Sequence, residues 1–354
     1  MLTNCRYSCP GVMRHMLGYR LVRKGKKMLA FHLLWSSVAG FALLIAGMRL
    51  TEAALTRWAG HRLAHWLGQA TSTPLRGFLF GTVITAALQS STAVTVLTIS
   101  FVNAGWISFS RSLGIILGTN VGTTVTTEIM GFRLHQYGWI VLGAACGIWL
   151  WTAAANEMRN RIAAPQSLFF PLRYGAVALA GFGLLLAGFD ALVGIGRHLQ
   201  HSALFSRLLD AASGQPVAVM MASALLTAMV HSSAAVIGMA MAAAGAGLLP
   251  LDTGIAVVLG ANVGTCFTGL AASLSGGPGG RFTALAQLVL NVAGAVAFLP
   301  LIPLLAAFSA MLAPANAAAQ IAHAQTLFNL ICSLAALPLA YWPGWDRLRP
   351  RHEN

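Results

Sequence analysis

The chain has 354 residues, of which 57% are hydrophobic and only 8% are charged. A soluble globular domain carries roughly 25% charged residues, so this composition excludes an ordinary soluble protein and indicates apolar surface that faces lipid. The net charge of +14 would suit a nucleic-acid-binding protein, but the basic residues lie before and between long apolar runs. That distribution is typical of loops at a membrane surface, and it argues against nucleic acid as a partner.

The N-terminal segment, residues 1–28, is predicted to be a basic arm without fixed structure, with either Met16 or Met28 as an alternative start. Its basic residues are Arg6, Arg14, Arg20, Arg23, Lys24, Lys26 and Lys27. The apolar run that follows is too long for a secretory signal and has no clear small-residue cleavage site. We therefore expect it to be the first membrane span.

Long stretches of the chain lack any Asp, Glu, Lys or Arg, and a membrane-spanning helix needs about 20 predominantly apolar residues. These stretches are 28–48, 77–110, 134–156, 211–251, 253–280 and 282–345. They predict an all-α polytopic membrane protein with spans at 29–50, 77–103, 112–131, 137–154, 173–192, 216–243, 254–272, 283–308 and 321–341. Residues 54–70 are predicted to form an interfacial amphipathic helix, because they carry Trp58, His61, Arg62, His65 and Trp66.

The sequence contains an internal repeat. Gln89-Ser90-Ser91-Thr92-Ala93-Val94 resembles His231-Ser232-Ser233-Ala234-Ala235-Val236, and Gly118-Thr-Asn-Val-Gly-Thr-Thr124 resembles Gly260-Ala-Asn-Val-Gly-Thr-Cys266. Both pairs have the same offset, 142 residues from Gln89 to His231 and from Gly118 to Gly260. A shorter echo relates Gln287 and Asn291 to Gln325 and Asn329, and such polar residues on apolar helices suggest interhelical hydrogen bonds.

The repeat divides the chain into five parts: the basic arm 1–28, a transmembrane repeat 29–154, a linker 155–172, a second transmembrane repeat with a final helix 173–342, and a basic tail 343–354. If 77–103 is a re-entrant hairpin, the first half crosses the membrane three times and the second half is inverted. Four polar residues at the middle of that segment favour the hairpin. The alternative is a parallel duplication, favoured by Arg159, Arg161 and Arg173, which give the linker the charge of a cytoplasmic loop.

The paired polar clusters are Gln89-Ser90-Ser91-Thr92 and His231-Ser232-Ser233. A helix that breaks there presents free N–H groups, which attract an anion, beside free carbonyl and hydroxyl oxygens, which suit a hard cation such as Na⁺. Each cluster could instead bond back to its own helix carbonyls. Its occurrence at equivalent places in two repeats favours a binding site. No Lys or Arg falls within the motifs, so we expect Ser and Asn dipoles and helix ends, rather than Arg side chains, to hold the anion.

The second motif pair offers amide and hydroxyl groups next to the same site, at Asn120, Thr123, Thr124, Asn262 and Thr265. The alternative for its glycines is a Gly-x-x-x-Gly face for close helix packing.

Glu128 is an intramembrane carboxylate and hence a possible cation or proton site. Alternatively, Glu128 lies near a helix end, reaches water and is supported by Arg133. A Ser hydrolase that uses His231 lacks an acidic orienting residue and a Gly-x-Ser-x-Gly elbow, so we expect no catalytic residue and no enzyme. The five scattered cysteines show no disulfide or metal-ligand spacing.

These paired motifs resemble those of the type II sodium-dependent phosphate cotransporters and their bacterial relatives. That family carries a duplicated Gln-Ser-Ser-Ser, each copy followed by a Gly-Ala/Thr-Asn-Ile/Val-Gly-Thr segment, and Ala324 to Asn329 is similar to its Ala-x-x-Leu-Phe-Asn segment. The resemblance implies inverted repeats with two re-entrant hairpins. It implies substrate and Na⁺ contacts at Gln89, Ser90, Ser91, Thr92, Ser232 and Ser233, supported by Asn120, Thr123, Asn262 and Thr265, with sodium held through Ser90, Ser91, Ser232 and Ser233.

The expected function is sodium-coupled symport of inorganic phosphate, or a similar oxyanion, across the cell (inner) membrane by a multi-pass protein. Sodium is the coupling ion and no cofactor is expected. His231 and Ala234 depart from the family motif, which puts one cation ligand in question. The alternatives are a carrier or exporter of another small anion, a non-transporting membrane sensor or regulatory subunit, and an intramembrane hydrolase.

Overall fold

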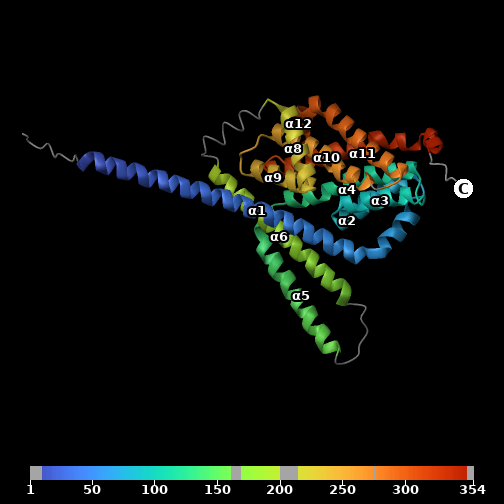
Figure 1. Ribbon diagram of the computed structural model, residues 1–354, viewed down its shortest axis with the longest axis horizontal. Coiled ribbons are helices and arrows are strands. Elements are labelled where there is room, and N and C mark those ends of the chain that lie inside the picture. The colour runs from blue at the N-terminus through green and yellow to red at the C-terminus, as the bar shows by residue number, and fades with distance from the viewer. Residues whose placement is uncertain (1–9, 161–168, 200–213, 275, 349–354) are drawn as a thin grey trace, which may run out of the picture.

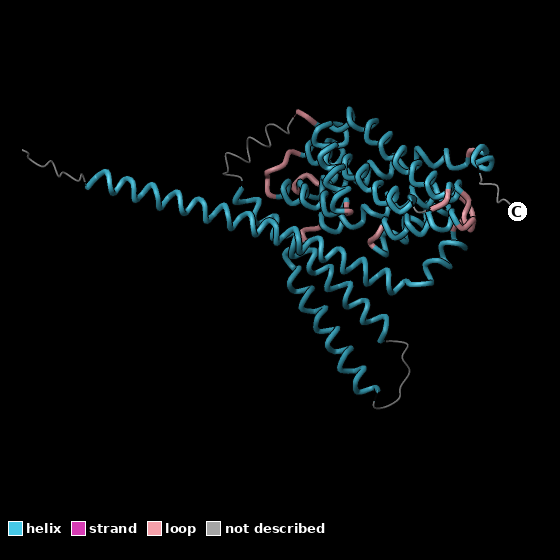
Figure 2. Tube along the Cα trace, in the orientation of Figure 1, coloured by secondary structure: helices cyan, strands magenta, loops and turns pink. Residues whose placement is uncertain are grey.

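The described part of the protein is built from helices. The computed structural model describes residues 10–160, 169–199, 214–274 and 276–348. No strand occurs within these ranges, and helix dominates the trace in Figure 2. The prediction of an all-α protein is therefore confirmed.

The first half of the chain contains five long elements and one short turn of helix. They are α1 (Pro10–Ala70), α2 (Pro74–Leu88), α3 (Ser91–Asn103), α4 (Phe109–Gly131), η1 (Leu134–Tyr137) and α5 (Gly138–Asn160). The second half continues with α6 (Phe169–Leu199), α8 (Pro216–Val230), α9 (Ser233–Gly245), α10 (Leu251–Leu274), α11 (Pro278–Phe298), η2 (Leu299–Leu301), α12 (Ile302–Leu312), α13 (Ala317–Ala336), η3 (Leu337–Tyr341) and η4 (Pro343–Leu348).

The two halves repeat the same local structure. Helices α2 and α8 have 15 residues each and both begin with a proline, while α3 and α9 have 13 residues each and both begin after a capping serine. Proline is well tolerated at the first helical position, where its missing N–H is not needed. The predicted spans 77–103 and 216–243 are thus each divided into two short helices.

Within the described residues, six helical segments are long and apolar enough to cross a membrane, which makes the chain a polytopic membrane protein. They are Leu33–Ala59, Leu134–Ala155, Pro171–Gly196, Leu251–Leu274, Pro278–Leu312 and Ala317–Tyr341. Large apolar side chains such as Trp139, Ile140 and Leu150 are exposed on α5, where only lipid would make them stable. Helix α4 also has the length of a span. It carries more polar residues than the six apolar segments, and most of its residues are buried against other helices rather than facing lipid.

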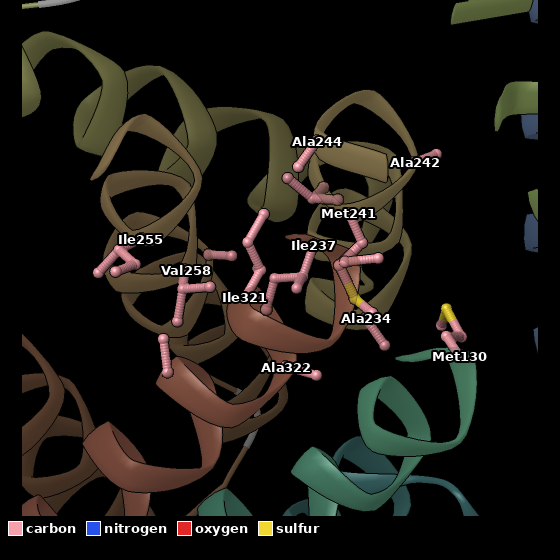
Figure 3. Close-up of a cluster of buried hydrophobic side chains, with 14 of the residues drawn as sticks. Met130, Ala234, Ile237, Met241, Ala242, Ala244, Ile255, Val258, Ile321 and Ala322 are labelled. Atoms are coloured by element: carbon pink, nitrogen blue, oxygen red, sulfur yellow. The ribbon is translucent and has the colours of Figure 1, made fainter. Parts of the chain in front are cut away.

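The helices form two groups in space. Helices α2 to α4 and α8 to α13 lie together, while α5 and α6 extend away from them as a pair and α1 runs past both groups (Figure 1). The main core joins the halves: Met130 of α4, Ile237 of α9, Val258 of α10 and Ile321 of α13 belong to one buried cluster (Figure 3).

The N-terminal region differs from the prediction. Helix α1 begins at Pro10 and continues without interruption to Ala70, so the basic arm is helical from residue 10 onward and the predicted helix 54–70 is part of α1. Residues 1–9 lie outside the described residues, as do 161–168 of the predicted linker. A basic sequence without apolar periodicity suggested an unstructured arm, but the helix of the adjoining span simply propagates into it.

Glycines in α4 and α10 allow very close helix packing. A Cβ atom added at Gly118 would overlap the backbone oxygen of Phe78 in α2, and one added at Gly260 would overlap the backbone oxygen of Met220 in α8. The alternative interpretation of these glycines, a small-residue packing face, is therefore correct. This packing fixes α4 against α2, and α10 against α8.

Gly260→Ala should lower the thermal stability of the protein, because the new methyl group would push α10 away from α8. Overpacking of this kind costs about 1–3 kcal/mol. Thermal melting of the purified protein in detergent measures the effect. Gly143→Ala is the matched control, because a Cβ at Gly143 meets nothing within 4 Å. Equal melting temperatures for the two variants would contradict the packing argument.

Candidate functional site

The two broken helices have the same backbone geometry at their tips. Gln89, after α2, has φ 54° and ψ 29°, and His231, after α8, has φ 55° and ψ 33°. Both lie in the left-handed region, which non-glycine residues seldom adopt. The next residues, Ser90 and Ser232, are extended and cap the following helices. Their Oγ atoms accept hydrogen bonds from the N–H groups of Ala93 at 3.1 Å and of residue 235 at 3.3 Å.

The two tips meet at one pocket, although their motifs are 142 residues apart in the sequence. Its lining comprises Ile45, Met48, Arg49, Glu52, Gln89, Ser90, Ser91, Thr92, Thr123, Thr126, His231, Ser232, Ser233, Ala234 and Thr265. Nine predicted site residues line it, and all come from the repeated motifs: Gln89, Ser90, Ser91, Thr92, Thr123, His231, Ser232, Ser233 and Thr265. The structure therefore brings most of the predicted site together.

The Gln89 side chain fixes the first tip. Its Nε2 donates to the carbonyl oxygen of Ala86 at 2.6 Å, and its Oε1 accepts from the hydroxyl of Thr126 at 2.6 Å. Thr126, on α4, was not among the predicted site residues. These bonds anchor the left-handed residue to both α2 and α4, so the tip is held without help from a ligand.

Two charged residues of α1 also line the pocket, and the sequence analysis missed both. The hydroxyl of Ser90 donates to Glu52 Oε1 at 2.5 Å, and Arg49 Nη1 lies 3.4 Å from Glu52 Oε2. The prediction that Ser and Asn dipoles and helix ends, rather than Arg side chains, hold the anion considered only basic residues within the motifs, whereas Arg49 of α1 also lines the pocket. The available signal was a pair of opposite charges within Leu33–Ala59, since charges inside a membrane span are costly and usually functional. The predicted span ended at residue 50 and so separated Glu52 from the membrane.

Asn120 and Asn262 occupy a second polar site instead of the pocket. Asn120 Nδ2 donates to Asn291 Oδ1 at 2.9 Å, and Asn291 Nδ2 donates to the carbonyl oxygen of Asn262 at 3.2 Å. Together with Asn329 they line a separate cavity of about 20 Å³, which has room for about one water. Thr124 also lies outside the pocket, and its hydroxyl bonds to the carbonyl oxygen of Val121.

Glu128 does not line the pocket either. Its carboxylate lies 3.0 Å from His323 Nδ1 and accepts a hydrogen bond from the hydroxyl of Thr326, both on α13. Arg133 does not support Glu128, because its guanidinium donates to the carbonyl oxygen of Ala315 at 2.9 Å. Glu128 therefore links α4 to α13. Within the described ranges, no group of three or more His, Cys, Asp or Glu side chains could hold a metal ion.

The chain matches the model of one protein family twice. The family is described as Na⁺/Pi-cotransporter, and the matches cover residues 43–194 and 195–340. The double match agrees with the internal repeat. No solved structure matches the chain.

Curated relatives include bacterial and mammalian proteins. The chain is 33% identical over 310 residues to "Uncharacterized protein YqeW" of Bacillus subtilis, covering 87% of this chain and 94% of YqeW. It is 25% identical over 301 residues to "Putative inorganic phosphate export protein YjbB" of Escherichia coli, covering 85% of this chain. The match spans 52%, about half, of the length of YjbB. A 59-residue segment, 17% of this chain and 9% of the relative, is 37% identical to sodium-dependent phosphate transport protein 2A of Rattus norvegicus.

Asn291→Leu should destabilise the protein, because it removes the partner of the half-buried Asn120 amide and one of the donors to the Asn262 carbonyl oxygen. Loss of such a partner costs about 1–3 kcal/mol. Thermal melting in detergent measures it, with Val289→Leu, at an exposed position of the same helix, as the control. If Asn291→Leu melts with the control, the asparagine cluster does not stabilise the fold.

Proposed function

The chain belongs to the Na⁺/Pi-cotransporter family, and we propose on that premise that it is a secondary active transporter in which sodium drives the symport of inorganic phosphate. The family is one of transporters rather than enzymes, and its membership supports phosphate transport by this membrane protein. Sodium then serves as a coupling ion that is carried, and not as a resident cofactor.

The observation that carries the proposal is the convergence of two equivalent helix breaks on one pocket. The N-terminal ends of α3 and α9 point their first N–H groups at the break, and such helix ends favour an anion. The last carbonyl groups of α2 and α8, with the hydroxyls of Ser91, Ser233 and Thr265, offer oxygen ligands for sodium. The proposed substrate and sodium contacts are therefore the nine motif residues that line the pocket.

Inverted halves with two re-entrant hairpins are part of the proposal. A 15-residue helix is about 22 Å long, shorter than the roughly 30 Å of a bilayer core, which supports half-spans for α2, α3, α8 and α9. If α1, α4 and α5 cross the membrane, the first repeat crosses three times and the second starts on the opposite side. Alternating access would then move one half against the other around the pocket. We also propose the inner membrane as the location and keep the predicted domain boundaries, 29–154 and 173–342, for the repeats.

Export of phosphate is the second candidate, and the name of YjbB favours it. The same pocket would serve both directions, because a carrier that alternates between two open states works along whichever gradient is larger. Carriage of another oxyanion of similar size and charge is also compatible with helix-end recognition, which reads charge rather than the central atom.

Glu128 remains a proposed cation or proton site, now outside the phosphate pocket. Its contact with His323 places an acid and a base between α4 and α13, at a helix pair that joins the halves. Asn120, Asn262 and Thr124 are proposed to support the site indirectly, by holding α4 and α10 in place, rather than by touching phosphate.

Uptake of labelled phosphate into vesicles that contain the purified protein tests the function. An inward sodium gradient should drive uptake, and an equal potassium gradient should not. Ser90→Ala and Ser232→Ala should each reduce uptake on the order of tenfold or more, because each removes a ligand and a helix cap. Ser100→Ala, an exposed hydroxyl on α3, is the control.

Equal uptake in sodium and potassium would contradict the proposed sodium coupling but not the proposed transport of phosphate. Uptake unchanged in both serine variants would show that the pocket is not the site. Phosphate efflux from preloaded vesicles under the reversed gradient measures the export direction in the same preparation.

A further inference from the structure

A single helix, α1, bears opposite charges that reach both hairpin tips. Glu52 Oε1 accepts the hydroxyl of Ser90 at the first tip. Arg49 Nη2 lies 3.4 Å from the carbonyl oxygens of Val230 and His231 at the second tip. Arg49 and Glu52 are one helical turn apart and 3.4 Å from each other. The two residues therefore connect the tips through one ion pair.

This ion pair lies inside an apolar span, Leu33–Ala59, where charges are expensive to maintain. Neutral hydrogen-bonding side chains could link the tips structurally with a smaller desolvation penalty than an ion pair. The side chains are also not sealed off, since 46% of Arg49 and 25% of Glu52 is exposed. Because the pair is partly exposed and lines the pocket, it is accessible to a small ion.

The Glu52 carboxylate occupies the place that an anionic substrate needs. It takes a hydroxyl hydrogen bond from Ser90, a proposed phosphate ligand, and it pairs with Arg49, which is the one cationic side chain of fixed charge among the residues that line the pocket. The remaining free volume is about 40 Å³, room for about three waters. Phosphate would compete with the Glu52 carboxylate for the Ser90 hydroxyl and for Arg49.

We propose that Glu52 fills the anion position of the empty site, and that Arg49 binds phosphate once sodium has neutralised Glu52. The inference rests on the proposed function and gives it a coupling device. Arg49 would exchange the carboxylate and the carbonyl oxygens of α8 for phosphate oxygens, to which a guanidinium can donate two parallel hydrogen bonds.

The coupling follows from the charges. Phosphate beside an ionised Glu52 places like charges a few ångströms apart, which opposes binding. A sodium ion on the carboxylate, with hydroxyls of the first tip as further ligands, removes that repulsion. Because binding free energies are linked reciprocally, sodium then tightens phosphate binding as much as phosphate tightens sodium binding.

Equilibrium binding of labelled phosphate to the purified protein tests this, in NaCl and in KCl of equal ionic strength. Wild-type protein should bind phosphate about tenfold or more tightly in NaCl. Glu52→Gln should bind nearly as tightly in KCl as in NaCl, within about threefold, because no charge remains to be neutralised. Glu52→Asp keeps the charge and should keep the sodium dependence.

Arg49→Gln should weaken phosphate binding in both salts on the order of tenfold or more, because it removes the charge partner of the anion. Arg49→Lys, which retains a positive charge without the planar fork, should recover part of the loss. Arg57→Gln is the matched control, since Arg57 lies on the same helix, is exposed and does not line the pocket. It should bind like the wild type.

The outcomes separate this inference from the proposed function. Full sodium dependence in Glu52→Gln, or wild-type affinity in Arg49→Gln, would overturn the inference while phosphate transport stands. Sodium-independent binding by the wild type would overturn the coupling device alone. If the wild type binds no phosphate in either salt, the proposed function fails and the inference fails with it. Thermal melting identifies any variant that does not fold. If Glu52→Gln or Arg49→Gln fails to fold, the phosphate affinities of Glu52→Asp and Arg49→Lys in the two salts test the inference instead.

Discussion

The structure depends on one constraint: backbone groups freed by a break in an apolar helix must find partners within the protein. The breaks at Gln89 and His231 each release N–H groups on one side and carbonyl groups on the other. Ser90 and Ser232 satisfy part of the N–H set, and Arg49 lies over the carbonyl oxygens of the second tip. The remaining backbone N–H and carbonyl groups at the breaks are available to a small ion, so the helix breaks that need partners also form the polar part of the pocket.

Close helix packing makes that arrangement possible. Gly118 and Gly260 bring α4 and α10 against the backbones of α2 and α8, and this closeness sets Thr123 and Thr265 beside the tips. The asparagines of the same motifs bond instead to Asn291 of α11: the Asn120 side chain and the Asn262 carbonyl oxygen both pair with its amide. These bonds stabilise the contact between α4, α10 and α11. One short motif thus serves packing through its glycines, the pocket through its threonine and interhelical bonding through its asparagine.

Much of this could be predicted because the repeat is visible as a shared offset and the polar clusters stand out in apolar surroundings. Helical periodicity alone could not show which way Asn120 and Asn262 face, since each is three residues from a pocket-lining threonine and points elsewhere. Arg49 and Glu52 were not predicted as pocket residues, because they belong to neither of the two repeated motifs. The pairing of Glu128 with His323 was equally inaccessible, as it joins residues 195 apart that only the packing of α13 on α4 brings together.

The charged pair on α1 has no counterpart in the other half. In this region the two copies align with an offset of 141, Ala39–Gly47 with Ala180–Gly188, so the positions on α6 that correspond to Arg49 and Glu52 are Asp190 and Val193. A carrier made of two identical, inverted halves would have inward-facing and outward-facing forms of equal energy, because exchanging the halves turns one form into the other. Different charges at corresponding positions of the two halves break that equivalence. In a carrier of that kind, Arg49 and Glu52 would favour whichever form accommodates them better, before any ion gradient acts on it.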